Sequence, residues 1–382
     1  MKIAVVGAGF SGAVVARELA LKGHQIDVFE SRDHVAGNCH TQRDSDTGVL
    51  VHVYGPHIFH TSNESVWSYV QQFGEFRPFI NRVKTTFQDR VFSLPINLLT
   101  INSFFEKSYS PKQAREFIAS IGELSQHEAL NFEEKAISTI GHALYEAFFY
   151  GYTKKQWGVE PRELPASILK RLPVRFDYND NYYDSKYQGI PVDGYTALVA
   201  NMLDHDGITV HLASKFSKNT QSNYDHVFYS GSIDSWFNFE FGRLDYRTLD
   251  FQLERLDGDF QGVAVMNYGD AEIPWTRISE HKHFAPWEQH KKTIIYREFS
   301  RACTETDIPY YPIRLLKEKV LLQKYVDIAS NESGVTFLGR LGTYRYLDMH
   351  VTIAEALEVA QAFQDSIIKK QRMPSFVCNP LN

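Results

Sequence analysis

Hydrophobic residues in the first thirty positions follow a strand, helix, strand order. The apolar run at residues 3–6 predicts a buried strand, and it ends in a turn that carries three glycines. Apolar residues then recur at helical spacing over 13–22, and residues 25–29 predict a second strand that ends beside Glu30. This order predicts the first unit of an α/β domain.

The rest of the chain continues to alternate between helical and strand patterns. Residues 63–73 predict a helix capped by Ser62 or Asn63, and residues 82–94 predict a hairpin with its turn at Gln88-Asp89. The other expected helices cover 195–203, 315–330 and 349–369, and the other expected strands cover 49–54, 209–212, 225–231, 249–256, 262–267, 275–279, 292–299 and 335–340.

The spacing Gly7-x-Gly9-x-x-Gly12 has a chemical meaning at the first junction of strand and helix. The first glycine permits the tight turn, the second a close backbone approach to a pyrophosphate, and the third close packing of the helix. The N-terminus of the helix that follows directs free N–H groups and the positive end of the helix dipole at phosphate. An acid such as Glu30 accepts hydrogen bonds from an adenosine ribose. The motif therefore predicts a bound dinucleotide.

The next loop narrows the identity of this dinucleotide. Glu30 repels a 2′-phosphate and so disfavours NADP, although Arg32 leaves NADP open; NAD and FAD both fit the motif. A second glycine-containing loop, residues 31–41 with Gly37-Asn38 at its centre, stands where many FAD proteins bring the backbone to the cofactor again. Because an NAD enzyme does not need this loop, FAD is favoured.

The pattern divides the chain into three parts. Helical spacing dominates 97–168, whereas residues 176–194 form an irregular connector. The expected fold class is α/β, a discontinuous Rossmann-like FAD-binding domain with an inserted helical domain and an antiparallel β-sheet domain. The expected limits are 1–75, 195–240 and 331–382 for the FAD-binding domain, 96–181 for the helical domain with a mobile lid near 165–181, and 76–95, 182–194 and 241–330 for the sheet and substrate domain.

Composition argues against several classes of protein. A chain of 382 residues with 43% hydrophobic and 23% charged residues suits a globular protein of two or three domains. A net charge of −6 without a long basic run argues against nucleic acid as a partner, and no apolar run reaches the length of a membrane span. Three widely spaced cysteines and the absence of a signal-peptide pattern favour a cytoplasmic location.

Aromatic residues, 14% of the chain, gather with arginines in three regions: 151–183, 275–312 and 339–350. Tyr and Trp present flat, rigid surfaces with one polar group, and Arg presents a fork of donors suited to phosphate. These regions predict a nucleotide-diphosphate site, and the third one places Arg340 and Asp348 at a strand-to-helix junction near the cofactor.

The histidines do not predict a metal site. Neither His57 with His60 nor His281 with His283 is accompanied by a carboxylate or cysteine that completes a recognisable ligand set, so we expect no metal. No Ser-His-Asp order or carboxylate pair predicts ordinary acid–base catalysis either. The cofactor is therefore expected to carry the chemistry.

Longer motifs, in order along almost the whole chain, resemble those of the bacterial UDP-galactopyranose mutase family. The matching segments are 55–60 (GPHIFH), 151–158 (GYTKKQWG), 171–176 (RLPVRF), 187–192 (YQGIPV), 246–247 (YR), 276–284 (TRISEHKHF) and 346–350 (YLDMH). Their length and order make this resemblance far more specific than the glycine motif.

The resemblance implies a flavoenzyme that interconverts UDP-galactopyranose and UDP-galactofuranose, with no net redox change, for cell-surface glycan biosynthesis. In that family the FAD must be reduced: its N5 attacks the anomeric carbon, UDP leaves, and the sugar ring opens as a flavin–sugar iminium forms and then recloses. The resemblance also suggests a homodimer.

The resemblance further implies roles for individual residues. Arg171 and Arg277 resemble the pair that neutralises the diphosphate, and with His60 they are the expected catalytic residues. The other expected substrate contacts are Asn81, Tyr152, Trp157, Tyr182, Arg247, Tyr311 and Tyr346. The expected cofactor contacts are Gly7, Gly9, Ser11, Gly12, Glu30, Ser31, Asn38, His57, Arg340, Tyr346, Asp348 and Met349.

One departure and three alternatives accompany this interpretation. Ala36 stands where the family usually has a glycine, which puts the local loop geometry in question more than FAD binding. The alternatives are a mutase of the same fold that acts on the N-acetylated UDP-sugar, an amine-oxidase-like FAD oxidoreductase, and a catalytically silent binder of nucleotide sugars.

Overall fold

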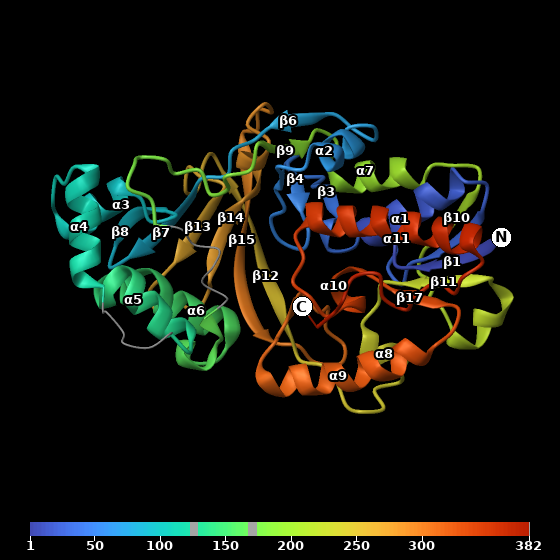
Figure 1. Cartoon of the computed structure of the whole chain (residues 1–382). Coiled ribbons are helices and arrows are strands. Elements are labelled where there is room, and N and C mark those ends of the chain that lie inside the picture. The colour runs from blue at the N-terminus through green and yellow to red at the C-terminus, as the bar shows by residue number, and fades with distance from the viewer. Residues whose placement is uncertain (123–128, 167–173, 382) are drawn as a thin grey trace.

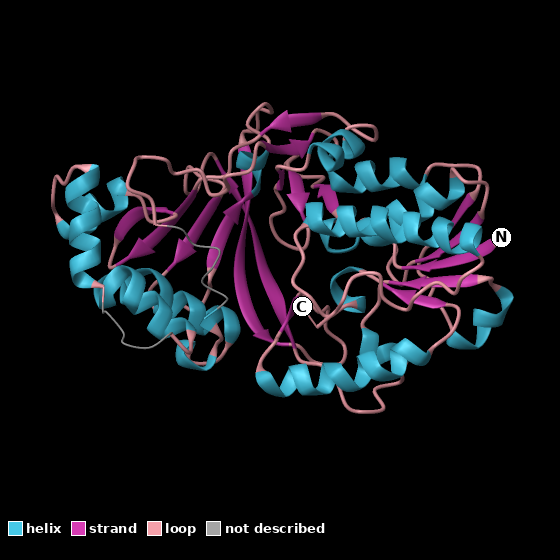
Figure 2. Ribbon diagram, viewed as in Figure 1, coloured by secondary structure: helices cyan, strands magenta, loops and turns pink. Residues whose placement is uncertain are grey.

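The computed structural model describes residues 1–122, 129–166 and 174–381. Three parts lie in a row: a parallel sheet flanked by helices, a long twisted sheet in the centre, and a group of helices at the other end (Figure 1). Segments from both halves of the chain build the first part, as the blue and red ribbons show. Long paired strands in the centre separate the two helical regions (Figure 2).

The parallel sheet contains, within the described residues, five strands in the order β10-β2-β1-β11-β17. Their bounds are β1 Lys2–Val6, β2 Gln25–Phe29, β10 Ile208–His211, β11 His226–Tyr229 and β17 Val335–Phe337. The apolar residues Ile3, Ala4 and Val5 are fully buried because helices cover both faces of the sheet. Helices α1 (Phe10–Ala20), α7 (Gly194–Leu203) and α11 (Met349–Lys369) share one hydrophobic core with it. The expected discontinuous Rossmann-like fold is confirmed.

The central sheet has the described strand order β16-β12-β15-β14-β13-β7-β8. Its strands are β7 Val83–Phe87, β8 Arg90–Leu94, β12 Tyr246–Asp257, β13 Val265–Tyr268, β14 Arg277–Glu280, β15 Lys292–Ala302 and β16 Tyr311–Pro312. The expected hairpin of β7 and β8 is confirmed, and its turn residues Gln88 and Asp89 have φ of 49° and 58°. One pairing in this sheet is parallel: β7 of the hairpin pairs with β13, a strand that comes much later in the chain. The expected antiparallel sheet is therefore a mixed sheet at this position.

The helical part contains α3 (Leu98–Phe105), α4 (Pro111–Ile121), α5 (Phe132–Tyr145), a π-helical turn η2 (Glu146–Tyr150) and α6 (Gly151–Trp157). Its core is rich in aromatic residues and includes Phe132, Tyr145 and Phe148. Gly141, within α5, has φ 75° and ψ 163° and so breaks the helical spacing expected over 97–168. Glycine alone adopts such angles without strain.

A small sheet of β5 (Phe59–Thr61), β9 (Tyr187–Pro191) and β6 (Phe76–Pro78) joins the first two parts. The irregular connector expected at 176–194 therefore contains a strand. The remaining elements are η1 Gly37–Cys39, β3 Thr41–Arg43, β4 Leu50–His52, α2 Glu64–Val70, η3 Pro161–Glu163, η5 Lys218–Asn223, α8 Ile233–Trp236, η6 His281–Phe284, α9 Leu316–Asn331 and α10 Gly339–Gly342. Helix α2 begins at Asn63, whose side chain accepts from the N–H of Val66 at 3.2 Å, as the cap prediction requires.

Helix α9 packs against the parallel sheet. Its buried residues Leu322 and Tyr325 share a core with Val227 and Phe337 of that sheet, although the expected limits grouped residues 241–330 with the central sheet. Among the helices of the described residues, none combines the length and the apolar character needed to cross a membrane.

Candidate functional site

The glycine motif forms one wall of a cavity of about 570 Å³ at the carboxyl edge of the parallel sheet. Gly7 has φ +99°, and a Cβ on it would lie 2.2 Å from Ser230 Oγ. A Cβ on Gly12 would lie 1.9 Å from the carbonyl oxygen of Gly7, so only glycine allows this helix to approach the turn. No side chain caps the N-terminus of α1 at Gly9. The cavity thus has the cradle that a pyrophosphate needs.

Glu30 binds the loops around this cavity. It is 6% exposed, its Oε2 accepts from the N–H of Ala8 at 2.9 Å, and its Oε1 accepts from the N–H of Arg32 at 3.0 Å. A carboxylate has lone pairs left after two such bonds. Glu30 can therefore hold the glycine loop and still accept from a ribose hydroxyl.

The second glycine loop meets the first one at the backbone. A Cβ on Gly37 would lie 3.4 Å from the Cα of Gly9, and the N–H of Ala36 donates to the carbonyl of Ala8 at 2.8 Å. Ala36 takes the left-handed conformation, with φ 74°, that a glycine would adopt without strain. The alanine therefore adopts, in this loop, backbone angles that favour glycine.

A second cavity, of about 590 Å³, lies between the parallel and the central sheets. The two cavities share four lining residues: Asn38, His57, Arg340 and Met349. A group that fills the first cavity and passes this junction would thus enter the second.

The expected cofactor residues separate between the two cavities. The first cavity is lined by Gly7, Gly9, Ser11, Glu30, Ser31, Asn38, His57, Arg340 and Met349. Tyr346 and Asp348 line the second cavity, and Gly12 supports the turn from behind. Burial lowers the pKa of His57 to about 4, so its ring is neutral at pH 7.

The expected substrate residues divide in a similar way. The second cavity is lined by His60, Asn81, Tyr182, Arg277, Tyr311 and Tyr346. Tyr152 and Trp157 stand on α6 outside this lining, and Trp157 packs on the helical core. Arg171 lies outside the described residues, as do residues 167–173 of the lid expected near 165–181.

Arg247 differs from its expected place on the sugar side. It is 6% exposed, and its Nε donates to the carbonyl of Gln156 at 3.1 Å and to Ser300 Oγ at 3.1 Å. Its guanidinium packs on Gly158, where a Cβ would lie 2.5 Å from Nη1. Arg247 therefore binds the C-terminus of α6 and does not line the cavity.

Arg277 lines the second cavity, as Arg340 does. Its Nη2 donates to the hydroxyl of Tyr152 at 2.5 Å, and its Nε lies 3.6 Å from Oε1 of Glu298. Burial opposes the charged form of Arg277, but Glu298, Tyr152 and Tyr311 together outweigh it, and the pKa of Arg277 is raised well above its usual range. The arginine is a fixed cation facing a cavity that can take an anion.

Two buried polar residues of this cavity had no signal in the sequence. Glu298 is 2% exposed and pairs with Arg277 across strands β14 and β15, and Asn267 is 8% exposed and pairs with Arg277 across β13 and β14. Burial raises the pKa of Glu298, and Arg277 opposes this shift. The strand register brings them to the cavity, and an apolar–polar pattern does not specify register across long connections.

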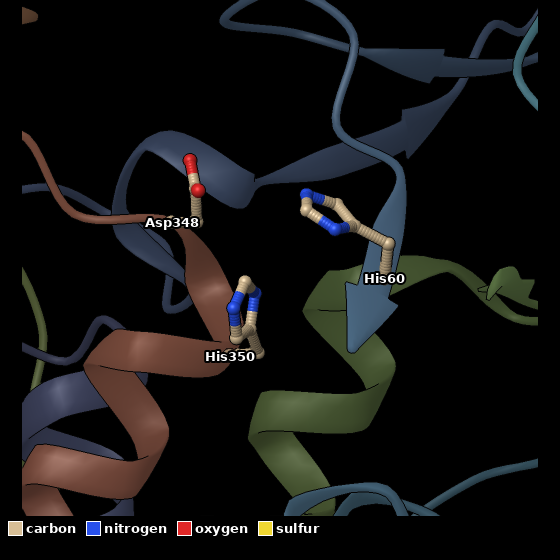
Figure 3. Close-up of side chains that lie close together, drawn as sticks. All are labelled: His60, Asp348 and His350. Carbon is tan, nitrogen blue, oxygen red and sulfur yellow. The ribbon is translucent and has the colours of Figure 1, made fainter. Parts of the chain in front are cut away.

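His60, Asp348 and His350 converge at one side of the second cavity (Figure 3). Their ligand atoms lie within 4.8 Å of one another. The His60 ring stacks on Tyr183 at 3.7 Å, and its Nδ1 lies 3.0 Å from Ser185 Oγ. Two imidazoles and a carboxylate are a donor set that transition metals accept, and Asp348, the residue before α11, supplies the carboxylate that the sequence pattern lacked. The expectation that the protein holds no metal stays a prediction.

The other histidine pair of the sequence is divided between two environments. His281 is fully buried, its Nδ1 accepts from the N–H of His52 at 3.2 Å, and burial lowers its pKa to about 3. His283 lies 3.4 Å from both Asp259 and Glu280. Because Lys282 also binds Asp259, at 2.7 Å, these charges compensate one another.

Comparison with known proteins gives a consistent result. A family model described as "UDP-galactopyranose mutase" matches residues 147–346, and one described as "NAD(P)-binding Rossmann-like domain" matches residues 5–73. The chain is 55% identical to a probable UDP-galactopyranose mutase of Klebsiella pneumoniae, over 98% of this chain and 97% of that protein. It is 50% identical to a dTDP-fucopyranose mutase of Escherichia coli, over 95% and 98%. A crystal structure of reduced UDP-galactopyranose mutase, 13% identical, superposes with a TM-score of 0.75 over 98% of each chain.

Proposed function

The chain belongs to the UDP-galactopyranose mutase family, and we propose that it interconverts UDP-galactopyranose and UDP-galactofuranose with a reduced FAD as its cofactor. Membership makes it an FAD-dependent isomerase. The proposal adds the sugar nucleotide, the need for reduction and the roles of individual residues.

The observation that carries the proposal is the meeting of the two cavities at Asn38, His57, Arg340 and Met349. The first cavity fits a dinucleotide, since glycines 7, 9 and 12 leave the space that its pyrophosphate needs. When bound and reduced, the flavin supplies the nucleophile, its N5, for the anomeric carbon of the sugar.

The protein's own contribution is to bind the diphosphate and to receive the charge that develops on it. Arg277 is positioned for this task, because Tyr152 and Glu298 fix its guanidinium before substrate arrives. Tyr311 and Tyr346, whose rings lie 5.5 Å apart in the same cavity, are the proposed hydroxyl donors to the diphosphate. Arg171 is proposed as the second cation on the basis of the family motif.

On the sugar side, His60 and Asn81 are the proposed polar contacts. The stack on Tyr183 and the contact with Ser185 fix the orientation of the His60 ring at the cavity wall. Asn81 is 3% exposed, and its Oδ1 is buried without a hydrogen-bond partner. A sugar hydroxyl would satisfy that oxygen.

A second substrate is favoured by one comparison. The chain is 50% identical to a dTDP-fucopyranose mutase. Compared with UDP-galactose, the substrate in that name has a base with an extra methyl group and a 6-deoxy sugar. The N-acetylated UDP-sugar remains a third candidate, which a larger pocket would accept. We rank UDP-galactose first, because the relative with that name is 55% identical.

The experiment incubates the purified protein with UDP-galactofuranose, dTDP-fucofuranose or the N-acetylated furanose, each with and without dithionite. Pyranose product from UDP-galactofuranose, only under reduction and with the highest kcat/KM, is the expected result. Equal rates without reductant would rule out the proposed role of the flavin. A higher kcat/KM for another sugar would move the assignment to that substrate, and net consumption of oxygen would favour an oxidoreductase.

The cellular context is also a proposal. We infer a cytoplasmic homodimer whose product serves cell-surface glycan biosynthesis, on the family resemblance. Light scattering with in-line chromatography tests the dimer, since a mass of 44.0 kDa corresponds to one chain.

A further inference from the structure

Lys155 of α6 binds four backbone carbonyls of a single segment. Its Nζ lies 2.8 Å from the carbonyl oxygens of Tyr268 and Asp270, 2.9 Å from that of Ile273 and 3.1 Å from that of Trp275. An ammonium group has three hydrogens, so this cluster of acceptors uses all of its donor capacity. The segment 268–275 leads from β13 to β14, and Arg277 is the first residue of β14.

The same segment touches the helix backbone directly. A Cβ on Gly151 would lie 2.2 Å from the carbonyl oxygen of Gly269, and a Cβ on Gly269 would lie 2.4 Å from that of Ala147. Both positions therefore require glycine for the helix to reach the segment. Lys155 lies one turn after Gly151 and closes the contact that these glycines permit.

The other end of α6 is bound to the sheet as well. Ser300 Oγ donates to the carbonyl of Gln156 at 2.7 Å, and Arg247 donates to the same carbonyl. Arg247 Nη2 also lies 3.4 Å from the carbonyl of Lys155. Helix α6 is thus held at its middle by the segment before β14 and at its end by β12 and β15.

This arrangement connects the two residues that meet at the proposed diphosphate site. Tyr152 lies three residues before Lys155 on α6, and Arg277 lies two residues after the last carbonyl that Lys155 binds. We propose that Lys155 is a positioning residue: by holding segment 268–275 against α6, it sets the place where Arg277 meets Tyr152. The proposal rests on the proposed function, in which Arg277 binds the diphosphate.

Lys155 is not itself a cavity residue. It does not line the second cavity, and its donors all point at carbonyls of the fold. Burial lowers its pKa to about 8, as expected for an ammonium taken from water without a carboxylate in direct contact. Its effect on binding must therefore pass through the segment and Arg277.

The test compares Lys155→Met with Lys154→Met in FAD-loaded protein. Methionine keeps the length of the side chain and removes the ammonium. Lys154 is the matched control, because it is the next residue of the same helix but is exposed and pairs with Glu160 at 2.7 Å. We expect Lys155→Met to weaken UDP binding at least tenfold by calorimetry and Lys154→Met to change it less than twofold, with equal flavin absorbance and circular dichroism.

A double-mutant cycle with Arg277→Ala separates positioning from general destabilisation. If Lys155 acts through Arg277, Lys155→Met changes UDP affinity less than twofold once Arg277 is absent. Equal losses in both backgrounds, or no loss in either, would overturn the proposal. Lys155→Gln, which keeps an NH₂ donor, replaces the methionine variant if that protein does not fold, and the same cycle decides. UDP binding needs no turnover, so this cycle stands even if the isomerase assay of the wild-type protein fails.

Discussion

The hydroxyl of Tyr152 accepts a 2.5 Å hydrogen bond from Nη2 of Arg277, and this bond joins the helical part of the molecule to the central sheet. Burial raises the pKa of Tyr152, and Arg277 opposes this shift, so the phenol is neutral and leaves the full positive charge on the guanidinium. The tyrosine can orient the cation without neutralising it.

Tyr152→Phe should therefore weaken the diphosphate site without removing its charge. Loss of one hydrogen bond to a charged group costs about 1.5–3 kcal/mol. This energy corresponds to a decrease in kcat/KM of roughly tenfold to a hundredfold, and we expect the variant to retain FAD. Tyr150→Phe is the control, since the Tyr150 hydroxyl contacts Lys154 and Glu160 instead. Equal kcat/KM values for Tyr152→Phe and the wild-type protein would show that the tyrosine does not orient Arg277 for the diphosphate.

Arg277→Ala should abolish turnover and also destabilise the fold, because it leaves Glu298 buried without its cation. Removing one partner of a buried ion pair costs about 3–5 kcal/mol. Adding Glu298→Gln removes the uncompensated charge, so the double variant should unfold at a higher temperature than Arg277→Ala and still lack activity. If Arg277→Ala keeps a normal kcat with bound FAD, the proposed role of Arg277 is wrong. Arg171→Ala should give the same loss of turnover.

Acid should destabilise the protein through its buried neutral histidines. The folded-state pKa is about 3 for His281 and about 4 for His57, below the ordinary value of 6.5. The stability that these neutral histidines contribute to the folded state is fully present above pH 6.5. It is lost as the pH falls from 6.5 through the folded-state pKa. At pH 5 each such group costs about 2 kcal/mol of stability relative to pH 7.5.

His281→Asn tests this assignment, because the asparagine oxygen can still accept from the N–H of His52. The variant should have a smaller decrease in melting temperature between pH 7.5 and pH 5 than the wild-type protein. His142→Gln, at a side chain that is 65% exposed, is the control and should keep the wild-type decrease. An unchanged pH dependence in His281→Asn would contradict the prediction.

Chelation should leave the activity unchanged, because the flavin is expected to carry the chemistry and no metal is expected. The cluster of His60, Asp348 and His350 makes the measurement worthwhile. Reduced enzyme dialysed against EDTA is assayed beside undialysed enzyme, and metal content is measured by mass spectrometry. A loss of rate that one equivalent of Zn²⁺ restores would show that the prediction is wrong.

Local patterns in the sequence were sufficient for the long elements. The helix expected at 349–369 and the hairpin turning at Gln88-Asp89 match the structure, because each depends on residues close in the chain. The strand Tyr187–Pro191 was missed, since it is short and pairs with β5 and β6 far earlier in the chain. Hydrophobic spacing carries no information on such a pairing.

The candidate site also combines features set by residues close in the chain with features set by contacts between distant segments. The glycine motif specifies the cofactor cavity because its geometry is local. By contrast, Glu298 beside Arg277 and Asp348 beside His60 arise from strand register and from the docking of α11. Arg247 lies outside the lining of the second cavity for a similar reason: its residue type suits an anion, but the carbonyls of α6 accept from its donors.

The parallel sheet also constrains the order in which the molecule can mature during synthesis. Strand β11 pairs with β17, and α11 packs on α1, so residues 335–369 complete a core that begins at residue 2. A Cβ on Gly339 would lie 2.5 Å from Ser11 Oγ, which brings this late segment against the first glycine loop. Because a chain emerges from the ribosome N-terminus first, the helical part, whose core extends to Val265 and Phe284, can form earlier. The cofactor cradle must wait until almost the whole chain has been made.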